Sequence, residues 1–344
     1  MGEGDDGFAK LGLGPTTFFV VNLDAKIAEL VDGYGFRSTA RSISDGGGRS
    51  RQAVLRKSSI ELRLVEGLDP EHPARAYVER HGDGVADIAL SVPDVARAFA
   101  GAVRRGASPV APPAVRDGVQ TASVGGFGDV THTFVPLDAV RTADPDEDGP
   151  RLGRIDHFAV CVEAGQLDLT VDFYVRVLDF RSIFSERIVV GGQAMLSTVV
   201  QSAAGTVTFT IIAPDPSRDP GQIDDFLKNH DGAGVQHIAF TAGDIVITVR
   251  EAQRRGVEFL GTPAAYYRLL TDHITLARHS TDELRDTNVL ADEDEHGQLF
   301  QIFTRSVHPR GTFFFELIER FGARTFGSGN ITALYEAVEA QRSP

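Results

Sequence analysis

The hydrophobic and polar positions of this chain form a pattern that recurs. Residues 84–110 (GVADIALSVPDVARAFAGAVRRGASPV) align without a gap with residues 234–260 (GVQHIAFTAGDIVITVREAQRRGVEFL). Each segment begins with the apolar run of a short strand, continues with the period of an amphipathic helix, and leaves that helix at Arg-Arg-Gly. A supersecondary unit that recurs in this way indicates a chain assembled from copied modules.

A second pair of segments follows the same pattern. Residues 15–38 align with residues 155–182, which contain additional residues before the shared Phe-Arg-Ser ending. Further apolar strands are expected in the four units at residues 60–67, 131–137, 206–214 and 312–319. The order strand, helix and three strands therefore occurs four times, which predicts an α+β fold of four βαβββ modules.

One segment interrupts the pattern between the second and third modules. Residues 141–153 (RTADPDEDGPRLG) are rich in proline, glycine and acidic residues and have no apolar period. Such a composition is typical of a linker. We therefore expect two domains, at residues 1–145 and 151–344.

The composition argues against several classes of protein. With 42% hydrophobic and 24% charged residues, the sequence is that of an ordinary soluble globular protein. The net charge of −14 argues against binding to nucleic acid or to an anionic membrane surface. No apolar run is long enough to span a membrane, and the acidic N-terminus lacks the features of a signal peptide. The single cysteine, Cys161, fits a reducing compartment, so we expect a cytoplasmic protein with a small-molecule ligand.

Histidine occupies one position of the first strand in only half of the modules. The alignment places Thr17, Asp87, His157 and His237 at this position. A histidine that folding required would recur in all four modules. Two imidazoles at matched places in paired modules favour a shared metal ligand, with an inert core histidine as the alternative.

A buried carboxylate supplies the third candidate ligand. Glu316 lies in the apolar run TFFFELIE, and burying a lone carboxylate there costs several kcal/mol unless a cation faces it. The paired module has Thr210 at the matched position, so only three of the four positions carry ligands. Two imidazoles and one carboxylate form the facial triad of non-haem Fe(II) oxygenases. A zinc hydrolase and a manganese or nickel isomerase use the same ligand types and stay open as alternatives.

Several ordered motifs then point to a known family. The blocks IDHFAV, GQIDDFL to GVQHIAF, EHGQLFQIFT, FFFELIER and FGSGNITALYEA resemble the vicinal oxygen chelate superfamily, and within it the family of 4-hydroxyphenylpyruvate dioxygenase and 4-hydroxymandelate synthase. The resemblance implies two open barrel-like domains, with a degenerate N-terminal half that holds no metal. It also implies that His157, His237 and Glu316 bind Fe(II), that an α-keto acid chelates the ion, and that no catalytic residue acts beyond the metal centre.

The resemblance also implies a substrate pocket. Each of its residues also has an ordinary explanation. Gln222 suits the first turn of an exposed helix, and Gln236 and Gln301 suit solvent-facing strand positions. Ser197 and Phe303 are equally common as plain strand and core residues. The family pattern places these substrate-facing residues at Ser197, Thr210, Ile212, Gln222, Gln236, Gln301, Phe303 and Ile331.

The C-terminal residues and two departures from the dioxygenase pattern refine this expectation. NITALYEAVEAQ predicts a helix, which the family resemblance turns into a lid with Ile331 facing the cavity. The dioxygenases typically have Pro-x-Asn where this chain has Thr210, Ile211 and Ile212, and phenylalanine where it has Ile331. Both departures resemble the synthase branch of the family.

The synthase branch implies a specific reaction. 4-Hydroxyphenylpyruvate and O2 are expected to yield CO2 and 4-hydroxymandelate, a precursor of hydroxyphenylglycine in peptide antibiotics, through benzylic hydroxylation. The alternatives are a dioxygenase that forms homogentisate and a binding protein without enzymatic activity. A glyoxalase-type enzyme is disfavoured, because it needs a second acid where Thr210 lies. The family also suggests a homodimer.

Overall fold

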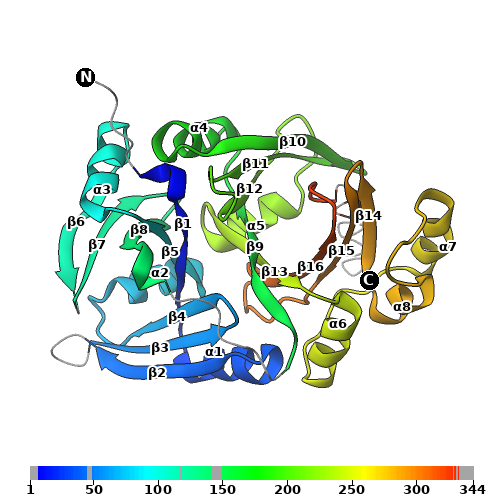
Figure 1. Cartoon of the computed structure of the whole chain (residues 1–344), viewed down its shortest axis with the longest axis horizontal. Coiled ribbons are helices and arrows are strands. Elements are labelled where there is room, and N and C mark those ends of the chain that lie inside the picture. The colour runs from blue at the N-terminus through cyan, green and yellow to red at the C-terminus, as the bar shows by residue number, and fades with distance from the viewer. Residues whose placement is uncertain are drawn as a thin grey trace.

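Two sheets of the same topology lie side by side in the computed structural model (Figure 1). The structure describes residues 7–44, 49–116, 118–140, 149–327, 329–330 and 332. The strand order is β2-β3-β4-β1-β5-β8-β7-β6 in the first sheet and β10-β11-β12-β9-β13-β16-β15-β14 in the second. The second order is the first shifted by eight strands, so the two sheets are built alike.

The strand bounds follow the predicted modules. In the first sheet they are β1 Gly12–Phe19, β2 Arg37–Ser44, β3 Ser50–Lys57, β4 Ile60–Gly67, β5 Gly84–Val92, β6 Pro109–Arg116, β7 Val119–Gly125 and β8 Thr131–Pro136. In the second sheet they are β9 Leu152–Cys161, β10 Arg181–Val190, β11 Gln193–Gln201, β12 Thr208–Pro214, β13 Gly234–Ala242, β14 Leu290–Asp294, β15 Gly297–Phe303 and β16 Phe314–Phe321. The α+β fold of four βαβββ modules in two half-barrels is confirmed.

One α-helix follows the first strand of each module. These four helices are α1 Leu23–Ala28, α3 Val95–Arg104, α4 Leu167–Leu178 and α6 Ile245–Arg254. The side chains of Asn22, Asp94 and Asp244 accept hydrogen bonds from the first turns of α1, α3 and α6, as helix-capping residues do. Within the described residues, no helix has the length and apolar character needed to cross a membrane.

Four further α-helices of the described residues lie outside the βαβββ pattern. Two precede the second module of each half, α2 Pro73–His81 and α5 Gln222–His230, and two interrupt the last module, α7 Ala264–His273 and α8 Thr281–Thr287. The helices α6, α7 and α8 lie on the outer side of the second half (Figure 1). The helices α7 and α8 are not predicted from the sequence, because the residues that form them have no counterpart in the other modules.

The register of the central strands corrects one alignment. Thr17 pairs with Asp87 in the first sheet, and Ala159 pairs with His237 in the second. Thr17 therefore corresponds to Ala159, and its expected match with His157 is wrong by two residues. Side chains alternate along a strand with a period of two, so a two-residue shift keeps every apolar residue on the same face and leaves no trace in the hydrophobic pattern.

The corrected register identifies the N-terminal counterparts of the candidate ligands. Pro15 corresponds to His157, and Asp87 corresponds to His237 as the sequence alignment placed it. Because Asp87 pairs with Thr131 as His237 pairs with Phe314, Thr133 corresponds to Glu316. Proline offers no side-chain ligand atom, so the N-terminal half does not reproduce the donor set.

The main hydrophobic core lies between the two sheets. Phe18 of the first half packs edge-on against Phe313 of the second, and Tyr34 packs in the same way against Phe315. A second apolar cluster lies on the opposite face of the second sheet and includes Ile212 and Phe303. The second sheet therefore uses one face to join the halves and the other to surround the candidate site.

Candidate metal centre

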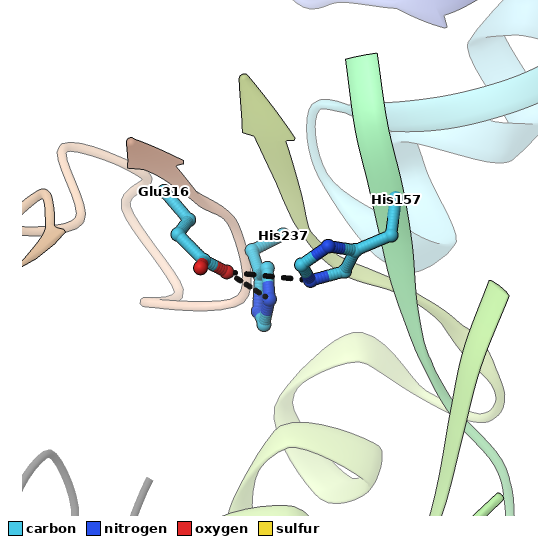
Figure 2. A group of neighbouring side chains, drawn as sticks. All are labelled: His157, His237 and Glu316. Atoms are coloured by element: carbon cyan, nitrogen blue, oxygen red, sulfur yellow. Dashed lines mark ion pairs between the residues drawn. The ribbon is translucent and has the colours of Figure 1, made fainter. Parts of the chain in front are cut away.

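Three side chains of the second sheet converge on one point. Nε2 of His157 lies 3.3 Å from Oε2 of Glu316, and Nε2 of His237 lies 3.2 Å from the same oxygen. Figure 2 shows the three side chains reaching this point from three separate strands. All three are buried, and their ligand atoms lie within 4.8 Å of one another. This arrangement can hold one metal ion.

The strand register explains why these residues meet. On β13, Ala239 pairs with His157 of β9 on one side and with Glu316 of β16 on the other. Residues paired across strands face the same side of a sheet, as does His237 two positions before Ala239. The small side chain of Ala239 leaves room between the three ligands.

Both histidines follow a bulged residue that contacts them. Asp156 and Gln236 each lack a pairing partner in the β9–β13 ladder, so each is an extra residue on its strand. Asp156 Oδ1 lies 2.9 Å from Nδ1 of His157, and Gln236 Oε1 lies 3.4 Å from Nδ1 of His237. Each bulge lets the preceding side chain contact the imidazole, which regular alternation would prevent.

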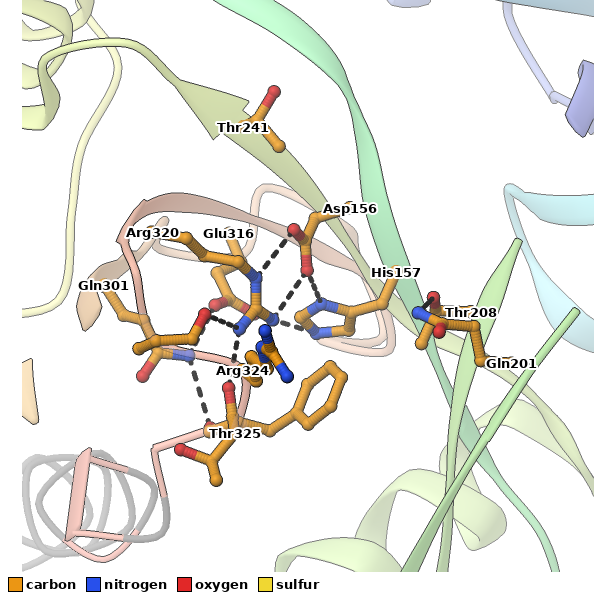
Figure 3. A network of polar contacts seen from close by, with 12 residues as sticks. Asp156, His157, Gln201, Thr208, Thr241, Gln301, Glu316, Arg320, Arg324 and Thr325 are labelled. Atoms are coloured by element: carbon orange, nitrogen blue, oxygen red, sulfur yellow. Dashed lines mark hydrogen bonds and ion pairs between the residues drawn. The ribbon is translucent and has the colours of Figure 1, made fainter. Parts of the chain in front are cut away.

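Arg320 holds Asp156 in position. Its Nε and Nη2 donate to the two oxygens of Asp156, each at 2.9 Å, and Nη1 donates to the backbone oxygen of Thr325 (Figure 3). The guanidinium lies over the ring of Phe326, and that ring packs edge-on against His157. A fixed carboxylate at Nδ1 keeps the proton there, so in the neutral form of His157 the lone pair lies on Nε2, which faces Glu316 and is free to bind a metal ion.

The other two ligands are also held by neighbours. Gln301 donates from Nε2 to Oε1 of Glu316 at 2.8 Å, which leaves Oε2 to face both imidazoles. The ring of His237 stacks on Phe314 and meets Phe303 edge-on. The positions of these two side chains are therefore set before any ion binds.

The charges of the group favour a bound cation. Burial opposes the charge of His157, but the carboxylates of Glu316 and Asp156 outweigh this effect and raise its pKa to about 9. Burial also opposes the charge of Glu316, but the two histidines lower its pKa to about 2. Burial lowers the pKa of His237. A positive charge is thus stabilised next to Glu316, and a divalent ion supplies it when both imidazoles are neutral.

The predicted pocket residues occupy three kinds of position. By strand register, the face that carries the ligands also carries Ser197, Thr210, Ile212, Gln301 and Phe303. Gln236 lies at the bulge, and Gln222 is half-buried at the start of α5. Ile331, like most of the predicted C-terminal helix, lies outside the described residues.

Two pocket positions differ in how their polar atoms are used. The hydroxyl of Thr210 is buried and has no hydrogen-bond partner within the part of the chain that the structure describes. Gln301, in contrast, is bonded to Glu316 and also to Asn330. Thr210 lies at the position that matches Glu316 in the paired module, and its unpartnered hydroxyl could bond to a bound small molecule. The amide of Gln301 is already engaged in hydrogen bonds.

A second group of possible metal ligands differs from the first because neighbouring residues already bond to its carboxylates. Asp244, His279 and Glu319 come together on the outer side of the second sheet. Glu319 already accepts hydrogen bonds from the backbone nitrogen of Ile245 and from His279, and it forms an ion pair with Arg278. Asp244 caps α6. The charges of this group are balanced without a metal ion.

The residues that hold the ligands are not predicted from the sequence. Asp156 and Gln236 each precede a candidate ligand, which is a visible signal in the sequence. Arg320 follows Glu316 by four residues and Asn330 lies in the segment interpreted as a helix start, and neither position indicates a contact with the site.

The fold and the site together define a protein of the vicinal oxygen chelate class. The model of the Glyoxalase/Bleomycin resistance protein/Dioxygenase superfamily matches residues 154–302, which include both histidines and Gln301. The 4-hydroxyphenylpyruvate dioxygenase of Dictyostelium discoideum is 31% identical over 96% of this chain and 98% of its own length. The same enzyme of Neurospora crassa is 32% identical over 78% of this chain and 71% of its own length.

Two solved structures of related proteins are also similar to this chain. A triple mutant of 4-hydroxymandelate synthase from Streptomyces coelicolor is 44% identical to this chain, with a TM-score of 0.88 over 96% of this chain and 99% of its own. A xylose isomerase-like TIM barrel/4-hydroxyphenylpyruvate dioxygenase fusion protein is 26% identical, with a TM-score of 0.76. The chain belongs to the 4-hydroxyphenylpyruvate dioxygenase family.

Proposed function

We propose that this chain acts as a 4-hydroxymandelate synthase. It would convert 4-hydroxyphenylpyruvate and O2 into 4-hydroxymandelate and CO2, with Fe(II) held by His157, His237 and Glu316. The observation that carries the proposal is the convergence of these three side chains, with Nε2 of each histidine within 3.3 Å of one carboxylate oxygen. The product would serve as a precursor of hydroxyphenylglycine.

The donor set fits a ferrous ion. Two imidazoles and one carboxylate on one side of an ion leave its other coordination positions open. When bound, Fe(II) would supply chelation of the keto acid and activation of O2. The ligands would leave one net positive charge, which the carboxylate of the substrate neutralises, so the pocket needs no arginine to bind that carboxylate.

The protein's own residues would orient the ligands and the substrate. Asp156 directs the lone pair of His157, and Gln301 directs one oxygen of Glu316. The hydroxyl of Thr210, buried without a described partner, is available to the substrate. Ile212 and Phe303 belong to an apolar cluster on the face of the sheet that carries the ligands, and such a surface suits an aromatic ring.

The choice of the synthase over the dioxygenase rests on the pocket and on the likeness to the synthase. Ile212 pairs with Ser197 across β11 and β12 and presents a branched apolar side chain where the dioxygenases typically have asparagine. The loss of that amide removes a hydrogen-bonding group that could hold the substrate ring. A ring held differently would bring the benzylic carbon, rather than the ring carbon, close to the metal.

We further propose that only the C-terminal half is catalytic. Residues 151–344 would form the catalytic domain and residues 1–145 a domain without metal. The counterparts of the three ligands in the N-terminal half are Pro15, Asp87 and Thr133. Thr131 and Thr133 of β8 both donate hydrogen bonds to Asp87, so the carboxylate of Asp87 is already engaged.

Product identification tests the proposal. The purified chain is loaded with Fe(II) without oxygen, given 4-hydroxyphenylpyruvate, and then exposed to O2. The two possible products are isomers, so chromatography against authentic standards must separate them, because mass alone does not. We expect 4-hydroxymandelate as the main product. Homogentisate as the main product would assign the dioxygenase activity instead, and a protein that binds no iron would be a binding protein of the same superfamily.

A further inference from the structure

The amide of Gln301 lies between a candidate metal ligand and the C-terminal segment. Its Nε2 donates to Oε1 of Glu316 at 2.8 Å, and its Oε1 accepts from Nδ2 of Asn330, also at 2.8 Å. Glu316, Gln301 and Asn330 expose 1%, 2% and 1% of their surface, respectively, so water does not compete for these bonds. A buried path of two hydrogen bonds therefore joins residue 330 to the carboxylate.

The path has a fixed direction. An ionised carboxylate only accepts hydrogen bonds, so Gln301 must turn its nitrogen toward Glu316 and its oxygen toward Asn330. Asn330 must then turn its nitrogen toward Gln301, which places its oxygen 3.3 Å from the hydroxyl of Tyr266. A rotation of either amide by half a turn would set like atoms against each other. The orientation of Asn330 is thus coupled to that of Glu316.

The segment before Asn330 is shaped to fit against Gln301. Gly327 has a φ of +69°, and a Cβ at this residue would lie 2.3 Å from Oε1 of Gln301. The backbone nitrogen of Gly329 donates to Asp292 at 3.2 Å. Only glycine permits this close approach, so Gly327 and Gly329 are held against β15 and β14 by contacts that do not involve the ligands themselves.

We propose that Asn330 is a positioning residue that couples docking of Phe326, Gly327 and Asn330 to the orientation of Glu316. With this segment in place, Gln301 holds Oε1 of Glu316 and presents Oε2 to the metal. Without Asn330, Oε1 of Gln301 loses its donor, the amide is held only through its nitrogen by Glu316 and Phe326, and it supports the carboxylate less firmly. The coupling is reciprocal, so metal binding must in turn stabilise the docked position of Phe326, Gly327 and Asn330. The inference rests on the metal site of the proposed function.

The experiment compares the wild-type chain with Asn330→Asp and Asn330→Ala. Asp keeps the size of the side chain and the oxygen near Tyr266 but cannot donate to Gln301, whereas Ala removes both contacts. Co(II) serves as the probe, because its visible absorption reports both its affinity and the geometry of its ligands. Amide hydrogen exchange of peptides that cover residues 325–332 is measured with and without Co(II).

We expect both variants to bind Co(II) more weakly than wild type, by up to the roughly 10- to 100-fold that loss of a direct partner of a metal ligand typically costs. We also expect Co(II) to slow exchange of residues 325–332 in the wild type and to have little effect on it in either variant. Variants that bind Co(II) with wild-type affinity and spectrum would overturn the proposal, as would equal protection of the segment by Co(II) in all three proteins.

Gln298→Glu is the matched control. Gln298 lies on β15, as Gln301 does, and is also buried. It bonds to the backbone of Thr275 and Ala277 rather than to a metal ligand. Gln298→Glu adds a buried carboxylate on β15, and Asn330→Asp adds one next to β15. The control substitution should leave the Co(II) affinity unchanged. Weakening in this control equal to that in the variants would assign their effect to general damage.

The outcomes separate the coupling from the proposed function. Absence of Co(II) binding in the wild type would refute the metal site and the coupling with it. Normal binding in the wild type together with unaffected variants would refute the coupling alone. Formation of homogentisate instead of 4-hydroxymandelate would refute the proposed activity and leave the coupling intact.

Discussion

Asp156 accepts a hydrogen bond from Nδ1 of His157 at 2.9 Å, although the two residues are adjacent on one strand. The bulge in β9 allows this contact, and Arg320 fixes the carboxylate from its other side. Burial alone would raise the pKa of Asp156, but the hydrogen bonds from His157 and Arg320 bring it well below its usual value. Asp156 is therefore an anion that orients one metal ligand.

Asp156→Asn is expected to weaken metal binding. Asparagine can accept a hydrogen bond from Nδ1 of His157 but carries no charge. His157 therefore becomes a weaker metal ligand, and Arg320 loses its anionic partner. Loss of such a support typically costs roughly 10- to 100-fold in metal affinity. Titration of the metal-free protein with Fe(II) under anaerobic conditions measures the change.

A half-buried aspartate elsewhere provides the control for this substitution. Asp87 accepts hydrogen bonds from Thr131 and Thr133 in the first sheet and does not contact the metal ligands. Asp87→Asn should keep the wild-type iron affinity, whatever its effect on the thermal midpoint. Equal affinities of the wild type and Asp156→Asn would show that the charge of Asp156 does not support the site.

Metal content distinguishes the two groups of possible ligands. The group of Asp244, His279 and Glu319 has its charges balanced by neighbours, so we expect one equivalent of bound iron rather than two. His237→Ala should abolish binding, and His279→Ala should leave the content at one equivalent while lowering the thermal midpoint. Elemental analysis after removal of free metal gives the ratio. Two equivalents in the wild type, with one lost in His279→Ala, would contradict this assignment.

Ile212 is expected to influence the product. Ile212→Asn restores the amide that the dioxygenase pattern has at this position, so the fraction of homogentisate should rise relative to 4-hydroxymandelate. The substitution also buries a polar group in an apolar cluster, which costs about 1–3 kcal/mol if the amide finds no partner. Chromatography of the products at full substrate conversion measures the ratio.

The conservative substitution at the same position is the control. Ile212→Val removes one methylene and adds no hydrogen-bonding group, so 4-hydroxymandelate should remain the main product. An unchanged ratio in Ile212→Asn, in a protein that still turns over, would show that this amide does not direct the ring.

The module order was predictable because each module repeats one pattern of strand and helix. The register was not, as the match of Thr17 with His157 shows. A shift of two residues keeps the buried face of a strand unchanged, so only the pairing of Thr17 with Asp87 reveals it. The helices α7 and α8 were missed for a different reason, because a repeat predicts nothing about an insertion that occurs once.

The candidate site was predictable only in part. His157, His237 and Glu316 could be named because a histidine or a carboxylate in an apolar strand is conspicuous, and the structure brings the three together. Their supports were not named. Alternation predicts that Asp156 faces away from His157, and the bulge that reverses this leaves no mark in the composition of the strand. Contacts such as Asn330 with Gln301 depend on the path of the chain.

Acid should loosen the contact between the two halves at His132. This buried residue of β8 bonds through Nδ1 to the backbone oxygen of Ile88 at 3.0 Å and through Nε2 to the hydroxyl of Tyr174 on α4 at 2.8 Å. Nδ1 must donate, since the carbonyl only accepts, so the tyrosine hydroxyl donates to Nε2. Protonation of Nε2 would destroy that acceptor, and the fold therefore holds His132 neutral.

The direction of the pH effect follows from the two pKa values. Burial lowers the pKa of His132 from 6.5 to about 4 in the folded protein. Below pH 6.5 the unfolded chain binds a proton that the folded chain does not, so the contribution to stability is present above pH 6.5 and is lost as the pH falls toward 4. Linkage predicts a loss of about 2 kcal/mol between pH 7 and pH 5 from this residue alone.

His132→Gln tests this effect, because glutamine cannot titrate in this range. The difference in the free energy of unfolding by urea between pH 7 and pH 5 should be smaller in this variant than in the wild type by about 2 kcal/mol. His230, whose pKa burial also lowers to about 4, keeps part of the pH dependence in both proteins. Replacement of the exposed His273 by glutamine should leave the wild-type difference unchanged. If His132→Gln and wild type lose equal stability on acidification, His132 is not the group that titrates.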